Sequence, residues 1–144
     1  MLNLAQMLPE YPAVSSFFGV GDITAPQLMA EIGDVRRFSH KGALVAFAGV
    51  DAPEHQSGTY EAKSRRVSKR GSPHLRKTLF MICSSILQLA PLADPVFQFM
   101  DRKRAEGKHY YVYMVAGANK FLRLYYGRVK AFFHNLEIGK AQLT

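Results

Sequence analysis

The stretch Phe18-Gly19-Val20-Gly21-Asp22-Ile23-Thr24-Ala25 decides the fold, because two closely spaced glycines precede the start signal of a helix. Glycine adopts backbone angles that other residues resist, so the pair predicts a tight turn. Thr24 and Gln27 have the spacing of a capping box, which predicts a helix that stops at Gly33. A short helix over residues 13–18 would complete a helix-hairpin-helix.

Such a hairpin is suited to binding an anion. We expect Gly19 and Gly21 to present backbone N–H groups to a nucleic-acid phosphate beside a helix N-terminus, without reading bases. Asp22 would weaken this contact by repulsion. The alternative is a tight helix–helix turn with no ligand.

Four further helix start or stop signals divide the rest of the chain into helices. Ser39 has the form of an N-cap for a helix that ends at Gly49, and Ser72-Pro73 and Asp94-Pro95 each combine a cap with proline at the first helical position. Gly107 separates the last two helices. The helices expected after these signals cover roughly residues 39–48, 73–90, 95–105 and 110–133, the last with a bend at Gly117.

Apolar side chains recur at helical spacing in two of these helices and predict their buried faces. The helix after Pro73 carries Leu75, Leu79, Ile82, Ile86 and Leu89. The last helix carries Val112, Val115, Phe121, Leu124 and Tyr125. The single cysteine, Cys83, lies in an apolar run, which predicts a buried thiol and excludes an internal disulfide.

The predicted fold class is therefore mainly α, with a helix-hairpin-helix (18–33), then a basic loop or β-hairpin (51–72), and a small helical bundle. One domain over residues 17–133 would be flanked by a loosely ordered lead-in (1–16) and a tail (134–144). No secretory signal is present, and no apolar run approaches the roughly 20 residues of a membrane span. We expect a cytoplasmic protein without a membrane partner.

Charge indicates the kind of partner. In 144 residues, 19 Lys and Arg outnumber 11 Asp and Glu, and the net charge of +8 favours a nucleic acid or another anionic surface. The excess is concentrated between Lys63 and Lys77, which hold seven Lys or Arg and no Asp or Glu. The alternative is a solvated basic face. The residues expected to hold a phosphate backbone are Arg65, Arg66, Lys69, Arg70 and Arg76.

Ser57, followed by Gly58, is the candidate nucleophile of this basic segment. A serine attacks a phosphodiester when its proton is removed and the developing charge is stabilised, and the neighbouring cations would supply the second requirement. His55 is a conceivable base. The alternative is an ordinary Ser-Gly loop dipeptide beside a solvated histidine.

A second aromatic and basic region covers residues 110–128. Its tyrosines would either stack on exposed bases or fill the core, and the helical spacing favours the core. Lys120, Arg123 and Arg128 would then remain as phosphate contacts. No Asp/Glu set resembles a two-metal site, no Cys/His cluster resembles a zinc site, and no Walker loop is present. The sequence therefore predicts no metal site of its own.

The order of several short motifs resembles the C-terminal domain of IS110/IS116/IS902-family transposases over roughly residues 17–133. The motifs are Gly19-Val20-Gly21-Asp22-Ile23-Thr24-Ala25, Glu31-Ile32-Gly33-Asp34, Arg37-Phe38, Ala46-Phe47-Ala48-Gly49-Val50, Gln56-Ser57-Gly58, Ser68-Lys69-Arg70-Gly71 and Asn119-Lys120-Phe121-Leu122-Arg123. The resemblance implies DNA transposition by recombination, DNA as partner, and a structured guide RNA as a second partner. It carries the nucleophile over to Ser57, which would form a transient phosphoserine with DNA.

The resemblance also implies an N-terminal RuvC-like domain, which we expect to be missing from this chain. In the family that domain holds a divalent metal such as Mg²⁺, and the complete enzyme is expected to be a homo-oligomer. We therefore expect this chain alone not to complete recombination. Two alternatives remain open: a non-catalytic helix-hairpin-helix module that binds nucleic acid, as a transposase remnant or regulator, and a structural RNA-binding protein.

Overall fold

The computed structural model describes residues 1–51 and 72–143, and every regular element in these ranges is helical. The predicted mainly α class is confirmed. The elements are α1 (Leu2–Gln6), α2 (Tyr11–Ser15), α3 (Thr24–Ile32), the 3-10 helix η1 (Val35–Arg37), α4 (Lys41–Ala48), α6 (Pro73–Leu89), α7 (Pro95–Ala105) and α8 (Tyr110–Leu143). The predicted basic loop or β-hairpin falls almost wholly on residues 52–71, outside the described ranges.

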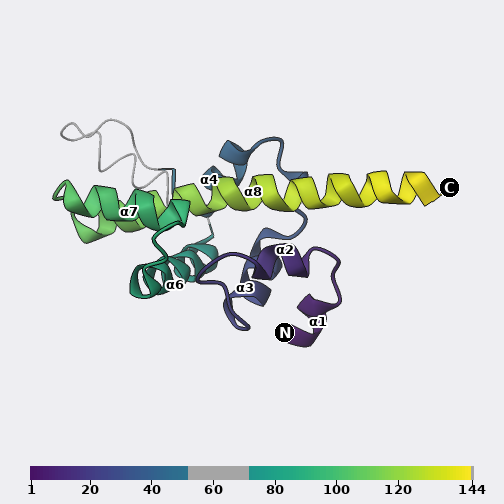
Figure 1. Ribbon diagram of the computed structural model, residues 1–144, viewed down its shortest axis with the longest axis horizontal. Helices are drawn as coiled ribbons and strands as arrows, with labels where there is room; N and C mark the ends of the chain where they lie inside the picture. Colours follow the sequence, from purple (N-terminus) through teal and green to yellow (C-terminus); the bar gives the residue numbers. More distant parts are fainter. Residues whose placement is uncertain (52–71, 144) are drawn as a thin grey trace.

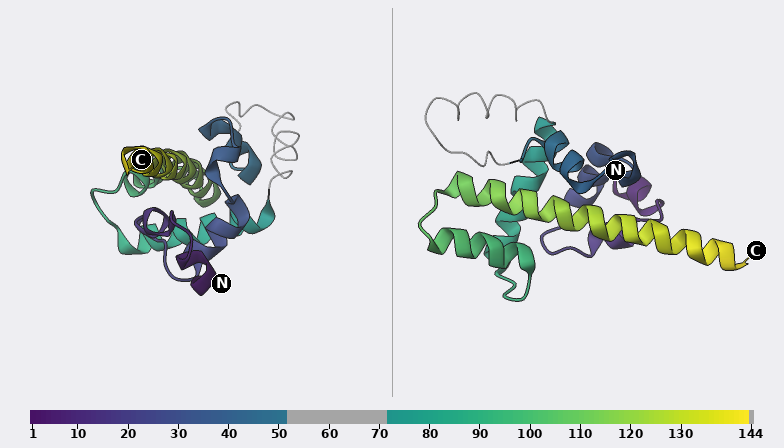
Figure 2. Two further views of the ribbon diagram at one scale, coloured as in Figure 1. Left: turned by 90° about the vertical axis from the view of Figure 1, so that its right-hand side faces the viewer. Right: turned by 90° about the horizontal axis from the view of Figure 1, so that it is seen from above.

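The long helix α8 is the axis of the molecule (Figure 1). Helix α7 packs along its first half, and α4 and α6 also contact it. Helix α3 packs on α6, and α1 and α2 pack against α3. The C-terminal part of α8 extends past the other helices, as the view from above shows (Figure 2). The core therefore lies around the first two thirds of α8.

Helices α6 and α7 begin where the sequence predicts, because their cap bonds are local. The Ser72 hydroxyl accepts a hydrogen bond of 3.1 Å from the Leu75 N–H. One Asp94 carboxylate oxygen accepts from the N–H groups of Val96 and Phe97, both at 3.0 Å. Each cap satisfies amides that have no partner inside the helix, and proline follows at the first helical position.

The buried faces of α6 and α8 are predicted correctly in most positions. Four residues of the α6 stripe are at most 1% exposed: Leu75, Leu79, Ile82 and Ile86. Leu89 is 64% exposed, so its predicted burial is wrong, because α6 ends there and the chain turns at Ala90. Val112 is 45% exposed, so its predicted place in the core is also wrong, because it lies in the first turn of α8. Phe121 and Tyr125 are buried as predicted.

The first forty residues differ from the prediction in three respects. The segment 1–16 is not loosely ordered, since α1 and α2 form there and bury Ala5 and Val14. The helix expected over residues 13–18 lies at 11–15. His40, rather than Ser39, caps α4, because its ring Nδ1 accepts a hydrogen bond of 3.2 Å from the Ala43 N–H.

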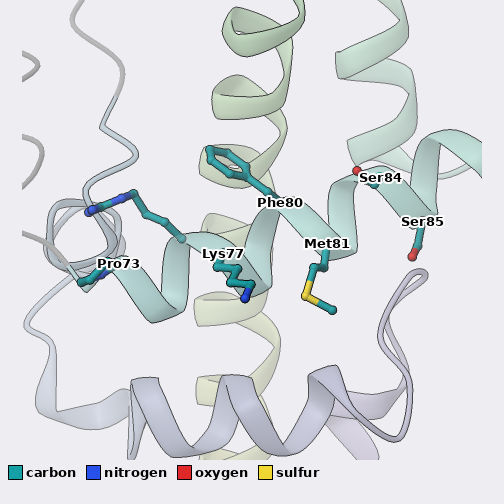
Figure 3. A pocket seen from close by; sticks show the side chains of 7 residues that line it. Pro73, Lys77, Phe80, Met81, Ser84 and Ser85 are labelled. Carbon is teal, nitrogen blue, oxygen red and sulfur yellow. The ribbon is translucent and has the colours of Figure 1, made fainter.

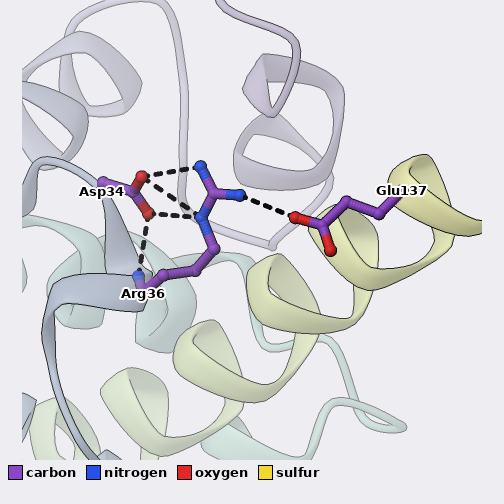
Figure 4. Close-up of polar contacts among 3 residues, drawn as sticks. All are labelled: Asp34, Arg36 and Glu137. Atoms are coloured by element: carbon purple, nitrogen blue, oxygen red, sulfur yellow. Dashed lines mark hydrogen bonds and ion pairs between the residues drawn. The ribbon is translucent and has the colours of Figure 1, made fainter. Parts of the chain in front are cut away.

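Helix α8 continues ten residues past its predicted end at Phe133 and runs without interruption through Gly117. Arg36, in η1, joins this extension to the body (Figure 4). Its guanidinium pairs with Asp34 at 2.7 Å and Glu137 at 3.3 Å, and lies 4.0 Å above the ring of Phe133. The side-chain hydrogen bond from Arg36 lowers the pKa of the Asp34 carboxyl below its usual value.

Candidate nucleic-acid interface

Part of the predicted site lies on residues that the structure does not describe. These are the candidate nucleophile Ser57, the candidate base His55 and four of the predicted phosphate contacts, Arg65, Arg66, Lys69 and Arg70. The structure does describe the residues on both sides of this segment, and they define where its two ends attach to the helical body.

The two ends of the segment attach beside one another at the C-terminus of α4. On one side, the buried residue Val50 accepts a hydrogen bond of 3.1 Å at its carbonyl from the side-chain amide of Asn119 on α8. On the other side, the Ser72 N–H donates at 3.0 Å to the carbonyl of Phe47 in α4. The described residues on either side of the segment, Val50 and Ser72, are therefore both fixed at the C-terminal end of α4.

The first turn of α6 is tied to two other helices at this place. The Ser72 hydroxyl donates at 3.2 Å to Glu31 on α3, and Arg76 donates at 3.3 Å to the carbonyl of Ala48. Ser72 thus both caps α6 and links α6 to α3 by a hydrogen bond. Arg76 is half-buried, and its guanidinium helps hold α4 and α6 together. Its predicted contact with nucleic acid stays a prediction.

A shallow groove of about 630 Å³ runs along the outer side of α6 from this anchored end. Figure 3 shows the side chains that line it, strung along the helix from Pro73 to Ser85. Lys77 stands near one end, and Phe80, whose ring lies 6.0 Å from that of Tyr111, stands in the middle. The sequence analysis did not predict this groove. The helical period that assigns the buried face of α6 does, however, place the groove-lining residues on the opposite, unburied face.

Gly19 is required for packing. A Cβ atom there would lie 2.7 Å from the carbonyl oxygen of Ile82 and 2.9 Å from Cγ1 of Ile86, and its φ is +79°. The backbone of the turn therefore rests directly on α6, as only glycine allows. Gly21 faces open space, because a Cβ atom added there would meet no other atom within 4 Å.

The Gly21 amide has a partner that the sequence pattern did not predict. The predicted Thr24–Gln27 capping box is wrong, because the Thr24 hydroxyl accepts a hydrogen bond of 2.9 Å from the Gly21 N–H. Gln27 instead accepts at 3.2 Å from Thr78 on α6. The Gly21 amide would have to exchange partners to bind a phosphate, and the phosphate role of Gly19 and Gly21 stays a prediction.

The predicted cations of α8 occupy three different environments. Arg123 is exposed, and its Nε donates at 2.8 Å to Asn119. Lys120 is half-buried, with Nζ 5.9 Å from the centre of the Phe99 ring. Arg128 donates at 2.9 Å to Ser16. Arg123 is therefore linked through Asn119 to the anchored end at Val50, Lys120 faces α7, and Arg128 braces the turn after α2.

Cys83 is fully buried, as predicted, and burial raises the pKa of its thiol to about 12. Across residues 1–51 and 72–143, no three His, Cys, Asp or Glu side chains gather as metal ligands would. No helix in that part of the chain has both the length and the apolar character to cross a membrane.

Comparison with known proteins identifies the family. The model of the transposase IS116/IS110/IS902 family matches residues 11–98, more than half of the chain. The protein belongs to this family. The matched range includes the turn at Gly19 and Gly21, α4, the segment that carries Ser57 and the whole of α6.

Three relatives show how the chain compares with longer proteins. It is 31% identical over 113 residues to the pilin gene-inverting protein of Moraxella bovis, which is 78% of this chain and 34% of the relative. It is 28% identical over 137 residues to an uncharacterized 43.6 kDa protein of insertion element IS110 from Streptomyces coelicolor (94% and 31%). The transposase for insertion sequence element IS1111A of Coxiella burnetii is 36% identical over 75 residues (52% and 20%). The chain thus spans about a third or less of each relative's length.

Proposed function

We propose that this chain is the serine-bearing domain of a DNA transposase that acts by recombination. Ser57 would attack a DNA phosphodiester, forming a bond between its Oγ and phosphorus while the bond from phosphorus to a deoxyribose oxygen breaks. The serine proton passes to a base, for which His55 is the nearest candidate in the sequence. The released deoxyribose oxygen takes up a proton and leaves as a hydroxyl group.

The family match is the observation that carries this proposal, because residues 11–98 include Gln56-Ser57-Gly58. The relatives give the reaction class further support, since two of their names describe a transposase and a gene-inverting protein.

The cations have two roles in this proposal. The set that would hold the DNA or guide-RNA backbone is Arg65, Arg66, Lys69, Arg70, Arg76, Lys120 and Arg123. Those nearest the scissile phosphate would also stabilise the negative charge that builds up as Ser57 attacks. Gly19 and Gly21 would add backbone amides at the hairpin. A divalent metal would come from a RuvC-like domain of the complete, oligomeric enzyme, and no residue of this chain is assigned to it.

The test is trapping of a covalent adduct between labelled DNA and the complete enzyme, or this chain supplemented with a family RuvC-like domain. Ser57→Ala should abolish the adduct and strand exchange while leaving the Kd for DNA nearly unchanged. Ser64→Ala and Ser68→Ala, in the same segment, are the matched controls and should retain the adduct. An adduct that persists in Ser57→Ala would remove Ser57 as nucleophile.

A non-catalytic nucleic-acid-binding module is the second candidate. The net charge of +8 and the seven Lys or Arg between Lys63 and Lys77 favour this function. This function predicts salt-sensitive binding and no covalent adduct under any supplementation. The same trapping experiment therefore separates the two functions.

A further inference from the structure

Three cationic side chains converge on one aromatic ring where α7 and α8 pack together. The guanidinium carbon of Arg102 lies 5.5 Å from the centre of the Phe99 ring, and Nζ of Lys103 lies 5.4 Å from it. Lys120 approaches the same ring from α8, with Nζ at 5.9 Å. Two helices thus place three positive charges around one half-buried phenylalanine.

The carboxylate that lies between Phe99 and Arg102 in the sequence does not pair with this group. The Asp101 carboxylate on α7 is paired with Arg104 at 2.8 Å. Within the described ranges, Arg102, Lys103 and Lys120 make no ion pair. Contact with the ring attracts each cation but leaves its charge in place. The surface around Phe99 therefore keeps a positive potential that attracts anions.

We propose that this surface, made by Phe99, Arg102, Lys103 and Lys120, binds the phosphodiester backbone of a nucleic acid. The inference rests on the proposed function and adds a second contact area, built from α7 and α8, to the basic segment around Ser57. Because three cations surround the Phe99 ring, the nucleic acid would contact this surface through its phosphates, and no base would stack on the ring. Binding at this surface is consequently independent of base sequence.

The position of Lys120 connects this surface to the rest of the interface. Its neighbour Asn119 holds the carbonyl of Val50, where the segment that carries Ser57 begins. Successive residues of a helix point about 100° apart, so the Phe99 surface and the attachment point of that segment lie on different sides of α8 at the same height along the helix. This surface would position the backbone of a strand, and the basic segment would act on it.

The salt dependence of binding tests the inference. In duplex DNA each neutralised phosphate contributes about 0.9 to the slope of log K against log salt. Lys103→Ala with Lys120→Ala should lower that slope by up to about two units between roughly 50 and 200 mM salt, equally for unrelated sequences. Lys41→Ala with Lys140→Ala removes the same charge from exposed positions on other parts of the molecule and should leave the slope unchanged.

Conservative variants and the choice of probe complete the experiment. Lys103→Arg with Lys120→Arg should retain the slope, because the charges remain. A short DNA duplex, its single strand and the matching RNA, measured by fluorescence anisotropy, show which backbone the surface prefers. An unchanged slope in the double alanine variant would overturn the inference while wild-type binding still supports the proposed function. Absence of wild-type binding to all three probes at low salt would overturn both.

Discussion

The side-chain amide of Asn119 on α8 donates a 3.1 Å hydrogen bond to the backbone carbonyl of Val50, 69 residues earlier in the chain. The oxygen of the same side-chain amide, Oδ1 of Asn119, accepts a hydrogen bond of 2.8 Å from Nε of Arg123. One amide therefore fixes the start of the segment that carries Ser57 and orients a predicted phosphate-binding arginine. No backbone donor of α8 could serve here, because the amides within the helix are already paired.

Replacement of Asn119 by alanine should destabilise the fold modestly. The carbonyl of the buried residue Val50 would lose its donor, and an unsatisfied buried group of this kind costs about 1–3 kcal/mol. Asn135→Ala on the exposed side of α8 is the control, and should be neutral or slightly stabilising because alanine favours helix. Urea unfolding of both variants gives the comparison, and an equal free energy of unfolding for the two would contradict the anchoring role.

Two glycines of one turn should respond differently to alanine. Gly19→Ala places a Cβ atom against the Ile82 carbonyl and Ile86 at a positive φ, so it should cost at least about 2 kcal/mol. Gly21→Ala meets open space and should change the free energy of unfolding by no more than about 0.5 kcal/mol. Thermal unfolding measures both, and a Tm for Gly19→Ala equal to that of Gly21→Ala would exclude the tight packing on α6.

Much of the helical layout could be predicted from the sequence, because its signals are local. Ser72 and Asp94 cap helices as expected, since the partner amides lie two or three residues away. Thr24 does not cap α3, because its hydroxyl accepts a hydrogen bond from the Gly21 N–H. This contact is also local, but the sequence pattern does not indicate it. The imidazole of His40 similarly replaces Ser39 at α4.

The site was less predictable, because its contacts join distant parts of the chain. Lys120 is recognisable in the sequence as a cation on a helix, but its approach to Phe99 depends on how α7 packs against α8. The run Arg102-Lys103-Arg104 is visible in the sequence, and the pairing of Arg104 with Asp101 has the local i,i+3 spacing of a helix. The bond between Asn119 and Val50 has no local signal at all.

Burial of Cys83 should make stability depend on pH in the alkaline range. The ordinary pKa of 9.0 for this thiol rises to about 12 in the fold because burial disfavours the thiolate. A raised pKa means that the folded state holds the proton more tightly, so this contribution to stability is complete below about pH 9 and is lost as pH rises towards 12. Tyr125, whose pKa burial also raises, adds to the same loss at higher pH.

The measurement is the free energy of unfolding by urea between neutral pH and the alkaline range, compared with Cys83→Ala. The variant should be less stable at neutral pH but should lose stability less steeply once pH exceeds about 9. In the native wild-type protein the thiol should also resist a maleimide reagent at pH 8. Rapid labelling without unfolding would show that Cys83 is accessible and would refute its burial.

The basic segment and the Phe99 surface should contribute separately to binding. Lys69→Ala with Arg70→Ala should flatten the salt dependence of DNA binding by up to about two units of slope, because two phosphate contacts are lost. Combining this pair with Lys103→Ala and Lys120→Ala should add the two reductions, provided the two sets contact different phosphates. Anisotropy titrations of both double variants and the quadruple variant measure this. A quadruple variant no flatter than either double would mean that the two sets share one phosphate contact area.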